Sequence, residues 1–401
     1  MNIRELLKKT TLAAILCATM ATSAWAQSVA WTTAKGAQSP IDFSTEQAVG
    51  ALSTATTITA TGTWSAAQVT NLQAALKSDG NIETDNSTLL TVDMSAAVWS
   101  DGVTAASLFR QCTALTSVIL PEADNANSIS FFCTFYYCES LKSITNLEKF
   151  TNVNYFYSTF YDCSSLESIT LPAGTSYAGI NFSCAFYGCR SLKSITNLEK
   201  FTNVSSFNTT FYDCSSLESI TLPAGTSNAS ISFYYTFDGC TALTSITNLE
   251  KFTNVNNFRY AFQNCSNLTS VELGVVPTNN IVDIFKGTDP NCLKYLPAGT
   301  TTVPTNWTNC IADGKALADI TLTDEKPFHC PQAFSMDGHT MTYTRTWKYA
   351  TKTGGWNTLY LPFAATATAD NTPLTPATGG ADGDYILKTL TGSTTGTLSM
   401  T

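Results

Sequence analysis

The side chains best suited to nucleophilic or metal chemistry are cysteines: the 401 residues include 13 cysteines but only two histidines, His329 and His339. In His329-Cys330 a base stands next to a nucleophile in sequence. Adjacent residues of an extended segment point to opposite sides, however, so this pair is not placed for catalysis. No zinc-ligand spacing, phosphate loop, HExxH, GxSxG or EF-hand pattern occurs. The sequence therefore predicts no catalytic residue, no metal site and no cofactor.

Most of the cysteines follow a regular spacing instead. Each of seven stands in a segment of the form Phe-x-x-Cys-x-x-Leu-x-Ser-Ile/Val, and successive segments are alternately 26 and 25 residues apart. Longer stretches recur unchanged after 51 residues, such as Ser143–Val153 at Ser194–Val204 and Phe160–Ser176 at Phe211–Ser227. One 51-residue unit therefore contains two half-units. The seven cysteines are Cys112, Cys138, Cys163, Cys189, Cys214, Cys240 and Cys265.

A period of about 25 residues with apolar positions in fixed phase predicts a solenoid, in which each half-unit forms one coil. The free energy gained by burying one coil's apolar side chains is smaller than the entropic cost of ordering its roughly 25 residues. Stacking between coils must therefore supply the remaining stabilisation. We expect seven or eight coils. The first phenylalanine ladder comprises Phe109, Phe135, Phe160, Phe186, Phe211, Phe237, Phe262 and Phe285. The second comprises Phe131, Phe156, Phe182, Phe207, Phe233 and Phe258.

The motif F-x-x-C-x-x-L-x-S-I-T-L-P resembles the BspA-like leucine-rich-repeat surface proteins. The resemblance covers about residues 101–300. It implies a secreted or cell-surface protein that presents its solenoid for adhesion to matrix proteins, other cells or glycans. Alternate coils here carry Asn-Leu-Glu-Lys in place of Leu-Pro, and the family's binding residues are not fixed by the motif. The resemblance therefore assigns no binding residue.

The start of the chain has the features of a secretory signal peptide. Basic residues precede an apolar run, Leu12–Met20, that is too short to span a membrane, and Ala24-Trp25-Ala26 supplies a cleavage pattern. We predict removal of residues 1–26 and a mature protein that is secreted or held at the cell surface without membrane insertion. The alternative is a lipoprotein anchored through Cys17. Leu16 disfavours it, because a small residue is preferred there.

Residues 27–100 are predicted to form an N-terminal cap, since an open coil face lined with phenylalanine would aggregate. Within it, Ser65 can cap a short helix that ends near Leu76, and Leu89–Met94 has the pattern of a strand.

The repeats give way to a different organisation near the C-terminus. The predicted solenoid occupies 101–300 and is followed by a linker or C-terminal cap at 301–318. Residues 319–401 are predicted to form a small β-sandwich-like module, so the fold class is mainly β with one short helix. The strands expected in this module are 320–322, 341–347 and 356–363, with 364–384 as a separating loop.

A tyrosine follows the first-ladder phenylalanine in four consecutive coils. If phenylalanine points inward these tyrosines point outward, and we predict an exposed stripe that serves as the binding face, because tyrosine is enriched at recognition hot spots. The alternative is that each ring packs along its neighbours. Outward Ser-x-Thr pairs and an alternating row of lysine and glutamate are expected to be structural. The tyrosines are Tyr136, Tyr161, Tyr187 and Tyr212.

Cysteines of an exported protein are ordinarily disulfide-bonded. Side chains stacked in successive coils point the same way, which leaves their Cβ atoms about 5 Å apart, beyond the reach of a disulfide. The seven repeat cysteines are therefore predicted to be buried thiols. Any disulfide is expected among Cys292, Cys310 and Cys330, because Cys133 and Cys184 are two coils apart.

These features predict a binding or adhesion protein that presents its solenoid to an extracellular protein or glycan, and not an enzyme. Nucleic acid is excluded as a partner, because the formal net charge is −9 and only 13% of residues are charged. The alternative is a structural spacer that displays the C-terminal module, with the ligand bound there.

Overall fold

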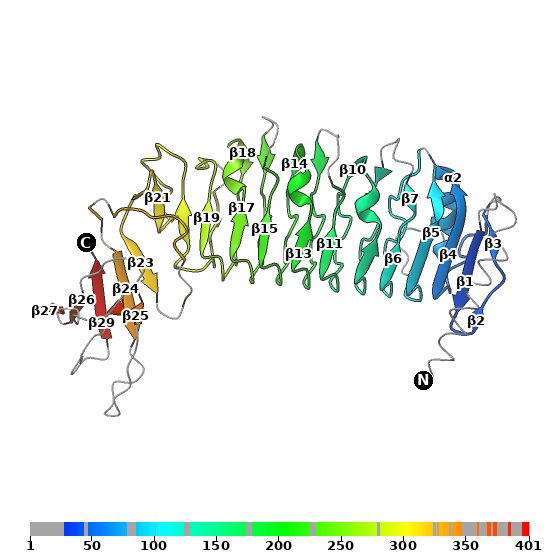
Figure 1. Ribbon diagram of the computed structural model, residues 1–401, viewed down its shortest axis with the longest axis horizontal. Helices are drawn as coiled ribbons and strands as arrows, with labels where there is room; N and C mark the ends of the chain where they lie inside the picture. Colours follow the sequence, from blue (N-terminus) through cyan, green and yellow to red (C-terminus); the bar gives the residue numbers. More distant parts are fainter. Residues whose placement is uncertain are drawn as a thin grey trace, which may run out of the picture. The chain divides into compact units, whose positions relative to one another are not determined.

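The computed structural model describes most of the chain after the predicted signal peptide, which lies outside the described residues. The described ranges are 28–43, 47–77, 86–100, 102–123, 129–173, 179–224, 230–278 and 281–323, with shorter stretches up to 400. Over these ranges the chain is a mainly β solenoid of about seven turns with one α-helix (Figure 1). Within them, no helix is both long and apolar enough to cross a bilayer.

The chain divides into two compact units. Unit 1 is Met1–Arg190 with Ile195–Asn197, and unit 2 is Ser191–Ser194 with Leu198–Thr401. The predicted domain boundaries differ from this division and remain predictions.

Unit 1 begins with strands that lead into the repeat sheet. The strand order is β2-β1-β4-β5-β6-β9; β1 is antiparallel to β4, and the pairs from β4 onward are parallel. The predicted strand at Leu89–Met94 instead begins at Thr91 and continues to Trp99, and the sequence did not reveal the strands before it. The cap strands are β1 (Ser28–Thr33), β2 (Gly36–Ala37), β3 (Ile41–Asp42), β4 (Thr57–Trp64) and β5 (Thr91–Trp99).

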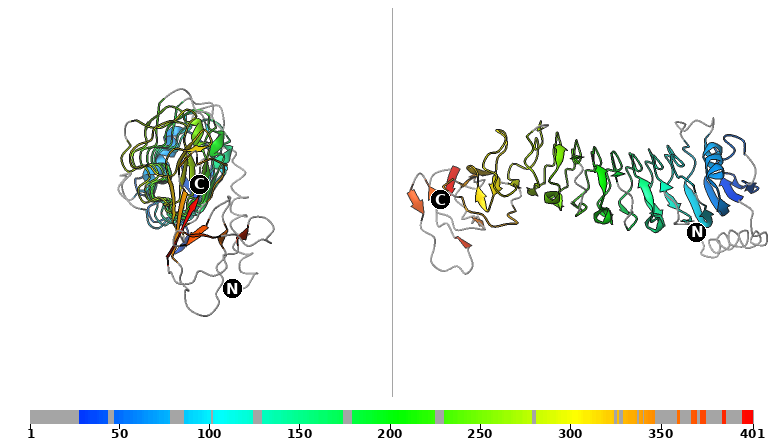
Figure 2. Two further views of the ribbon diagram at one scale, coloured as in Figure 1. Left: turned by 90° about the vertical axis from the view of Figure 1, so that its left-hand side faces the viewer. Right: turned by 90° about the horizontal axis from the view of Figure 1, so that it is seen from above.

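The predicted cap helix is confirmed as α2 (Ala66–Leu76). Ser65 is its N-cap, and the Ser65 N–H donates to the Gln68 side-chain oxygen at 2.8 Å, as in one half of a capping box. The helix buries Leu72 and Leu76, among others, and lies beside the first coils (Figures 1 and 2).

Lys77, at the end of α2, is fully buried, and its ammonium donates to the Arg110 carbonyl. In the next coil the corresponding carbonyl, that of Tyr136, accepts from the Gln111 N–H at 2.6 Å. The cap therefore supplies the hydrogen-bond donor that the first coil lacks because no coil precedes it.

Each coil contains a three-residue strand, a second short strand and a turn segment, and within each unit the coils lie side by side (Figure 1). The elements of unit 1 are β6 (Ser117–Ile119), β7 (Glu122–Ala123), β8 (Ile129–Ser130), β9 (Ser143–Thr145), the 3-10 helix η1 (Leu147–Lys149), β10 (Val153–Tyr155), β11 (Ser168–Thr170) and β12 (Ile180–Asn181). β13 (Ser194–Thr196) lies at the division between the units. Unit 2 continues with η2 (Leu198–Lys200), β14 (Val204–Ser206), β15 (Ser219–Thr221), β16 (Ile231–Ser232), β17 (Ser245–Thr247), η3 (Leu249–Lys251), β18 (Val255–Asn257) and β19 (Ser270–Glu272).

The 51-residue period reflects coils that are joined in pairs. β15 and β17 pair in parallel with serine opposite serine and threonine opposite threonine. β6 and β9 also pair in parallel, with serine opposite serine and Ile119 opposite Thr145. The coil that carries Asn-Leu-Glu-Lys also contributes an asparagine in the left-handed conformation. Asn146 (φ 71°) donates its amide to the Leu120 carbonyl at 2.9 Å, and Asn248 does the same to Leu222 at 2.8 Å. The alternation of two kinds of coil in the sequence therefore reflects hydrogen bonds that join the coils in pairs.

The phenylalanine ladders form the core of both units, as predicted. In unit 1 the first-ladder rings of four coils stack with centroids 5.1–5.7 Å apart and interplanar angles of 6–19°. In unit 2 the ladder reaches Phe285, whose ring lies 5.3 Å from that of Phe262, and Trp307 closes it edge-on at 5.0 Å. The four rings of unit 1 are Phe109, Phe135, Phe160 and Phe186.

The last coil ends in a small sheet. Strand β20 (Leu293–Tyr295) pairs in parallel with β21 (Cys310–Ala312), which folds back on β22 (Lys315–Ala316). Segment 301–318 therefore contains strands, and its assignment as a linker or a C-terminal cap remains a prediction.

The C-terminal residues partly follow the predicted strands. β23 (Ile320–Thr323) and β24 (Met341–Thr346) lie where they were expected, and β25 (Leu359–Tyr360) lies within the predicted strand 356–363, whose other residues lie outside the described ones. The separating loop predicted at 364–384 is wrong, because β26 and β27 form an antiparallel pair inside it; strands of three threonine-rich residues give little sequence signal. The remaining strands are β26 (Ala367–Ala369), β27 (Thr372–Leu374), β28 (Asp384–Tyr385) and β29 (Thr395–Met400).

Replacing Phe160 with alanine should lower the free energy of unfolding by about 3–5 kcal/mol, because its ring is stacked on both sides and coil walls cannot close the cavity. Urea unfolding measures the change. Thr151→Ala in the same coil removes an exposed side chain and should cost under about 0.5 kcal/mol. Equal effects of the two substitutions would contradict the stacked core.

Candidate functional site

The candidate site lies on the turn segments of the coils. Each runs from the second-ladder phenylalanine, or the residue in its place, to the repeat cysteine. We call these segments the turn ridge of each unit. In unit 1 they are 105–112, 131–138, 156–163 and 182–189, and in unit 2 they are 207–214, 233–240 and 258–265.

The turn ridge bends at left-handed residues two positions before and two after the first-ladder phenylalanine. Around Phe135 these are Cys133 (φ 51°) and Tyr137 (φ 59°). Their N–H groups donate to the carbonyls of Tyr157 at 3.0 Å and Tyr161 at 2.7 Å in the next coil. A left-handed residue with a Cβ is unfavourable on its own, so contacts between coils hold this backbone. An isolated coil would not form it.

In unit 1 the residue after the first-ladder phenylalanine is only partly buried and lies on the outer side of the turn ridge. In unit 1 the rings of Tyr136 and Tyr161 stack at 4.6 Å, and those of Tyr161 and Tyr187 at 4.4 Å with only 2° between their planes. The Arg110 guanidinium lies over Tyr136, 4.2 Å from the ring centroid. We call this row the tyrosine column. In unit 2, Tyr212 lies edge-on to another tyrosine at 6.0 Å.

The expectation of freely exposed tyrosines is wrong, because all four of the predicted residues are half-buried. The alternative, that rings pack along their neighbours, describes the tyrosine column. Ring faces are covered by the adjacent rings, so the column presents edges and hydroxyl groups. Burial raises the pKa of Tyr161, and the neighbouring tyrosines Tyr187, Tyr137 and Tyr136 raise it further, so this hydroxyl stays neutral. Whether the column binds a ligand remains a prediction.

Two further aromatic side chains extend this surface. Phe132 is 41% exposed and its ring stacks on Tyr157 at 5.4 Å, and Tyr155 is 47% exposed. The sequence did not single them out, because they stand three positions before the first-ladder phenylalanine or just before the second-ladder one. For Phe132 the available signal was that Tyr157 holds the same position in the next coil, whereas Tyr155 has no aromatic counterpart in the adjacent coils.

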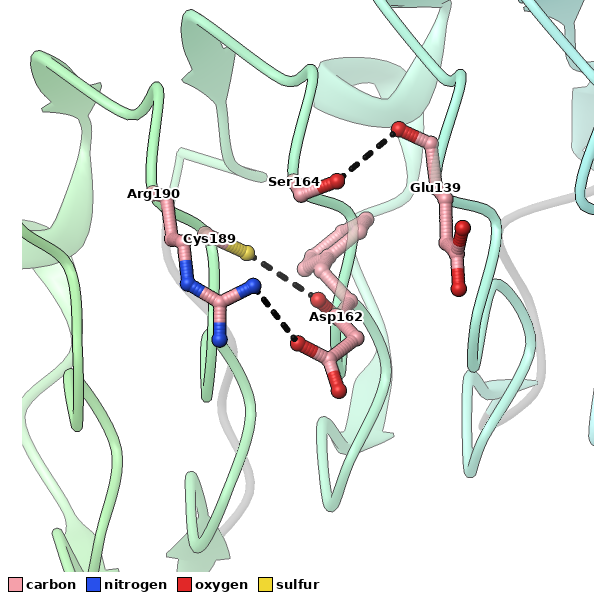
Figure 3. A network of polar contacts seen from close by, with 6 residues as sticks. Glu139, Asp162, Ser164, Cys189 and Arg190 are labelled. Carbon is pink, nitrogen blue, oxygen red and sulfur yellow. Dashed lines mark hydrogen bonds and ion pairs between the residues drawn. The ribbon is translucent and has the colours of Figure 1, made fainter.

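An acidic group beside the tyrosine column has a structural role. Asp162 lies 4.0 Å from Arg190 (Figure 3). A Cβ at Gly188 would come within 2.0 Å of the Asp162 carboxylate oxygen. Gly188 is therefore glycine both because its φ is positive and because the space is occupied. The nearby Ser164 hydroxyl donates to the Glu139 backbone carbonyl at 3.3 Å. These contacts join successive coils, and the Glu139 carboxylate takes no part in them.

The seven repeat cysteines, which we call the cysteine column, are buried, as predicted, and their thiols form hydrogen bonds. The Cys189 thiol donates to the Phe160 carbonyl at 3.0 Å (Figure 3), and the same carbonyl accepts from the Cys163 N–H at 3.1 Å. Both lone pairs of the phenylalanine carbonyl are thereby satisfied. Cysteine is small enough for the core and still supplies this donor. The same sulfur contact, at 3.0–3.1 Å, is made by Cys138, Cys163, Cys240 and Cys265.

The three cysteines expected to carry any disulfide are also thiols. Cys292 and Cys310 are buried, and Cys330 is half-buried with its sulfur 3.6 Å from the Tyr295 hydroxyl. The sequence left their disulfide state open, and the structure has all three as free cysteines. His329 is exposed, and the Cys330 thiol has the Tyr295 phenol as a neighbour.

A threonine column supports the turn ridge in the same way as the cysteines, and it was not predicted from the sequence. Thr159 donates its hydroxyl to the Phe131 carbonyl at 2.8 Å, and Thr236 does so to Phe207 at 2.8 Å. The signal was a threonine directly before the first-ladder phenylalanine in several coils.

The strand face is exposed, as expected. Ser143 and Thr145 in β9, and the corresponding pairs in β11, β15 and β17, face solvent, as do Lys142, Glu167 and Lys193. Glu218 completes that charged row. Among the described residues, no group of three or more His, Cys, Asp or Glu could hold a metal ion.

Comparison with known proteins identifies the repeats. The family model "BspA type Leucine rich repeat region" matches residues 104–228 and 157–288. Residues 104–288 therefore carry BspA-type leucine-rich repeats, and the resemblance seen in the sequence is confirmed there.

Two solved structures align with this chain at low TM-scores. The crystal structure of the TLR13–ssRNA13 complex aligns at 15% identity over 61% of this chain and 43% of that chain, with a TM-score of 0.25. A leucine-rich repeat protein from Bacteroides ovatus aligns at 18% identity over 59% of this chain and 77% of its own, with a TM-score of 0.23. No curated protein matches in sequence. Similarity at this level says nothing about function.

The double variant Cys292→Ala/Cys310→Ala should lose less stability at alkaline pH than the unchanged protein. Burial raises the pKa of each thiol from 9.0 to about 11, so the folded chain keeps protons that the unfolded chain releases. This contribution to stability is complete below the unfolded pKa and is lost as pH rises through the folded value. Each thiol should account for about 1 kcal/mol of the free energy of unfolding that is lost between about pH 8 and pH 10, as measured by urea unfolding. Parallel losses in both proteins would contradict the assignment.

Tyr161→Ala should lower the free energy of unfolding by about 1–3 kcal/mol, because two ring stacks are lost at about 0.5–1.5 kcal/mol each. Tyr161→Phe keeps both stacks and should cost less than about 1 kcal/mol. Thermal or urea unfolding distinguishes the two. A Tyr161→Ala protein as stable as the unchanged one would mean that the column is not packed.

Proposed function

We propose that this protein is exported by its N-terminal signal and binds an extracellular protein through the tyrosine column of unit 1. A role in adhesion at the cell surface fits the family to which the repeats belong, in which solenoids typically bind ligands. After signal cleavage, no membrane insertion is proposed.

The observation that carries the proposal is the rigid array of Tyr136, Tyr161 and Tyr187 with Arg110 at its end. Tyrosine and arginine are enriched at the centres of protein interfaces, and their energetic contribution grows when the rings are already held in place. Stacking fixes these rings, so little side-chain entropy is lost on binding. Since the ring faces are covered, the column suits hydrogen bonding and edge contacts with a protein better than stacking against a sugar ring.

Catalysis and nucleic-acid binding are not proposed. Leucine-rich-repeat regions are typically non-catalytic. An acidic chain with a formal net charge of −9 also lacks the clustered cations that phosphate neutralisation requires.

The alternative proposal is a structural spacer whose C-terminal β-sandwich-like module binds the ligand. Unit 2 ties the first strand after the repeats to the last coil: Asn291 donates its amide to the Thr323 carbonyl at 2.9 Å and accepts from the Thr323 N–H at 2.6 Å. A chain that ends after Thr323 keeps these bonds and lacks the rest of the module, so it separates the two proposals.

Binding of the mature chain to immobilised extracellular-matrix proteins, with a glycan array in parallel, should identify a protein ligand. Tyr161→Ala should then weaken binding about 30-fold, the effect of a hot-spot residue, while Thr170→Ala on the strand face of the neighbouring half-unit should leave it unchanged. The chain ending after Thr323 should bind normally. Loss of binding in that shortened chain, with Tyr161→Ala binding normally, would establish the spacer instead.

A further inference from the structure

The turn ridge of unit 2 carries a second aromatic cluster, at different positions from the tyrosine column. Tyr235 and Tyr260 stack at 4.4 Å with 18° between their planes. Tyr234 lies edge-on to Tyr235 at 4.5 Å and to Tyr260 at 6.3 Å. All three side chains are half-buried, and they stand before the first-ladder phenylalanine, where the sequence pattern singled out no residue.

An arginine lies beside this cluster. The Arg259 guanidinium is 5.5 Å from the Tyr260 ring centroid. In the part of the chain that the structure describes, no carboxylate forms an ion pair with Arg259, and its Nε atom is buried without a hydrogen-bond partner. Arg190, by contrast, lies 4.0 Å from Asp162. In an acidic protein, Arg259 is a cation whose side chain has unused donors.

Exposed aliphatic side chains adjoin the arginine. The Tyr260 N–H donates to the Val282 carbonyl at 3.0 Å, as the Tyr235 N–H donates to that of Arg259. Val282 therefore occupies in the next coil the position that Arg259 has in its own. Val282 is 45% exposed and Ile281 is 37% exposed.

The acidic residues near the cluster are already engaged. Asp238 is buried and its carboxylate accepts from the Asn264 amide at 3.0 Å. Asp283, which follows Val282, pairs with Lys286 at 3.1 Å. Neither carboxylate neutralises the guanidinium.

We propose that Tyr234, Tyr235, Arg259 and Tyr260, with Val282, form a docking site for a protein segment in which an Asp or Glu carboxylate stands beside an apolar side chain. A guanidinium presents parallel N–H donors that match a carboxylate, and the phenol hydroxyls add donors around it. The exposed aliphatic groups favour a protein over an acidic glycan, because a partner's apolar side chain is needed to cover them. The inference rests on the proposed binding class, but on a surface separate from the tyrosine column.

The test uses the full mature chain and a fluorescent peptide in which two glutamates flank a leucine. A matched peptide carries glutamine in place of glutamate, and sodium polygalacturonate serves as the glycan probe. The glutamate peptide should bind at least about tenfold more tightly than the glutamine peptide, and R259Q should lose at least about tenfold in affinity, the worth of a charged hydrogen bond. R259K should only partly restore binding, because it lacks the planar fork.

Two control variants establish whether binding depends on Arg259 itself. R190Q makes the same change of charge at an arginine that is already paired, and Tyr161→Ala alters the tyrosine column; both should bind the peptide normally. Absent binding, equal binding of the two peptides, an unaffected R259Q or an equally weakened R190Q would each overturn the proposal. Tighter binding of polygalacturonate than of the peptide would overturn it in favour of a glycan. Failure of the Tyr161→Ala test of the proposed function would leave this result unaffected.

Discussion

The structure depends on a single constraint: the hydrogen bonds of each coil are completed only by its neighbours. The Phe160 carbonyl accepts one bond from its own coil and one from the Cys189 thiol of the next, and the left-handed residues of the turn ridge donate to the following coil. Because buried polar groups are costly when unpaired, the ends of the array need substitutes. Buried Lys77 supplies one at the first coil, and Trp307 covers the last phenylalanine ring.

This constraint accounts for the residue types that recur within the repeat. A thiol or a threonine hydroxyl reaches a neighbouring phenylalanine carbonyl from inside the core, which alanine or valine cannot do. On the strand side of the coil, the left-handed asparagine of alternate coils donates its side-chain amide to a leucine carbonyl of the preceding coil, as Asn146 does to Leu120. Repetition at 51 residues is thus the repetition of one set of bonds between two unlike coils.

The sequence predicted the inward ladders, the cap helix and the buried cysteines because each follows from period, apolar pattern or capping. It misjudged the exposure of Tyr161 for a physical reason. Periodicity tells which side of a coil a residue faces, but identical residues in successive coils also face one another along the stack. An outward ring can therefore be covered by its neighbours, and a single sequence does not distinguish the two. The Arg259 cluster was missed because its positions, two and three residues before the first-ladder phenylalanine, carry unlike residues in different coils, so the sequence shows no ladder there.

Stacking also determines what the two candidate surfaces can recognise. In the tyrosine column the ring faces are used for stability, and only edges and hydroxyl groups remain for a partner. Around Arg259 the same stacking of Tyr235 on Tyr260 leaves a guanidinium beside exposed Val282. Because contacts between coils hold both sets of side chains, their arrangement exists before a ligand arrives, and binding need not order it. The interaction that builds the solenoid is therefore also the one that organises its binding surfaces.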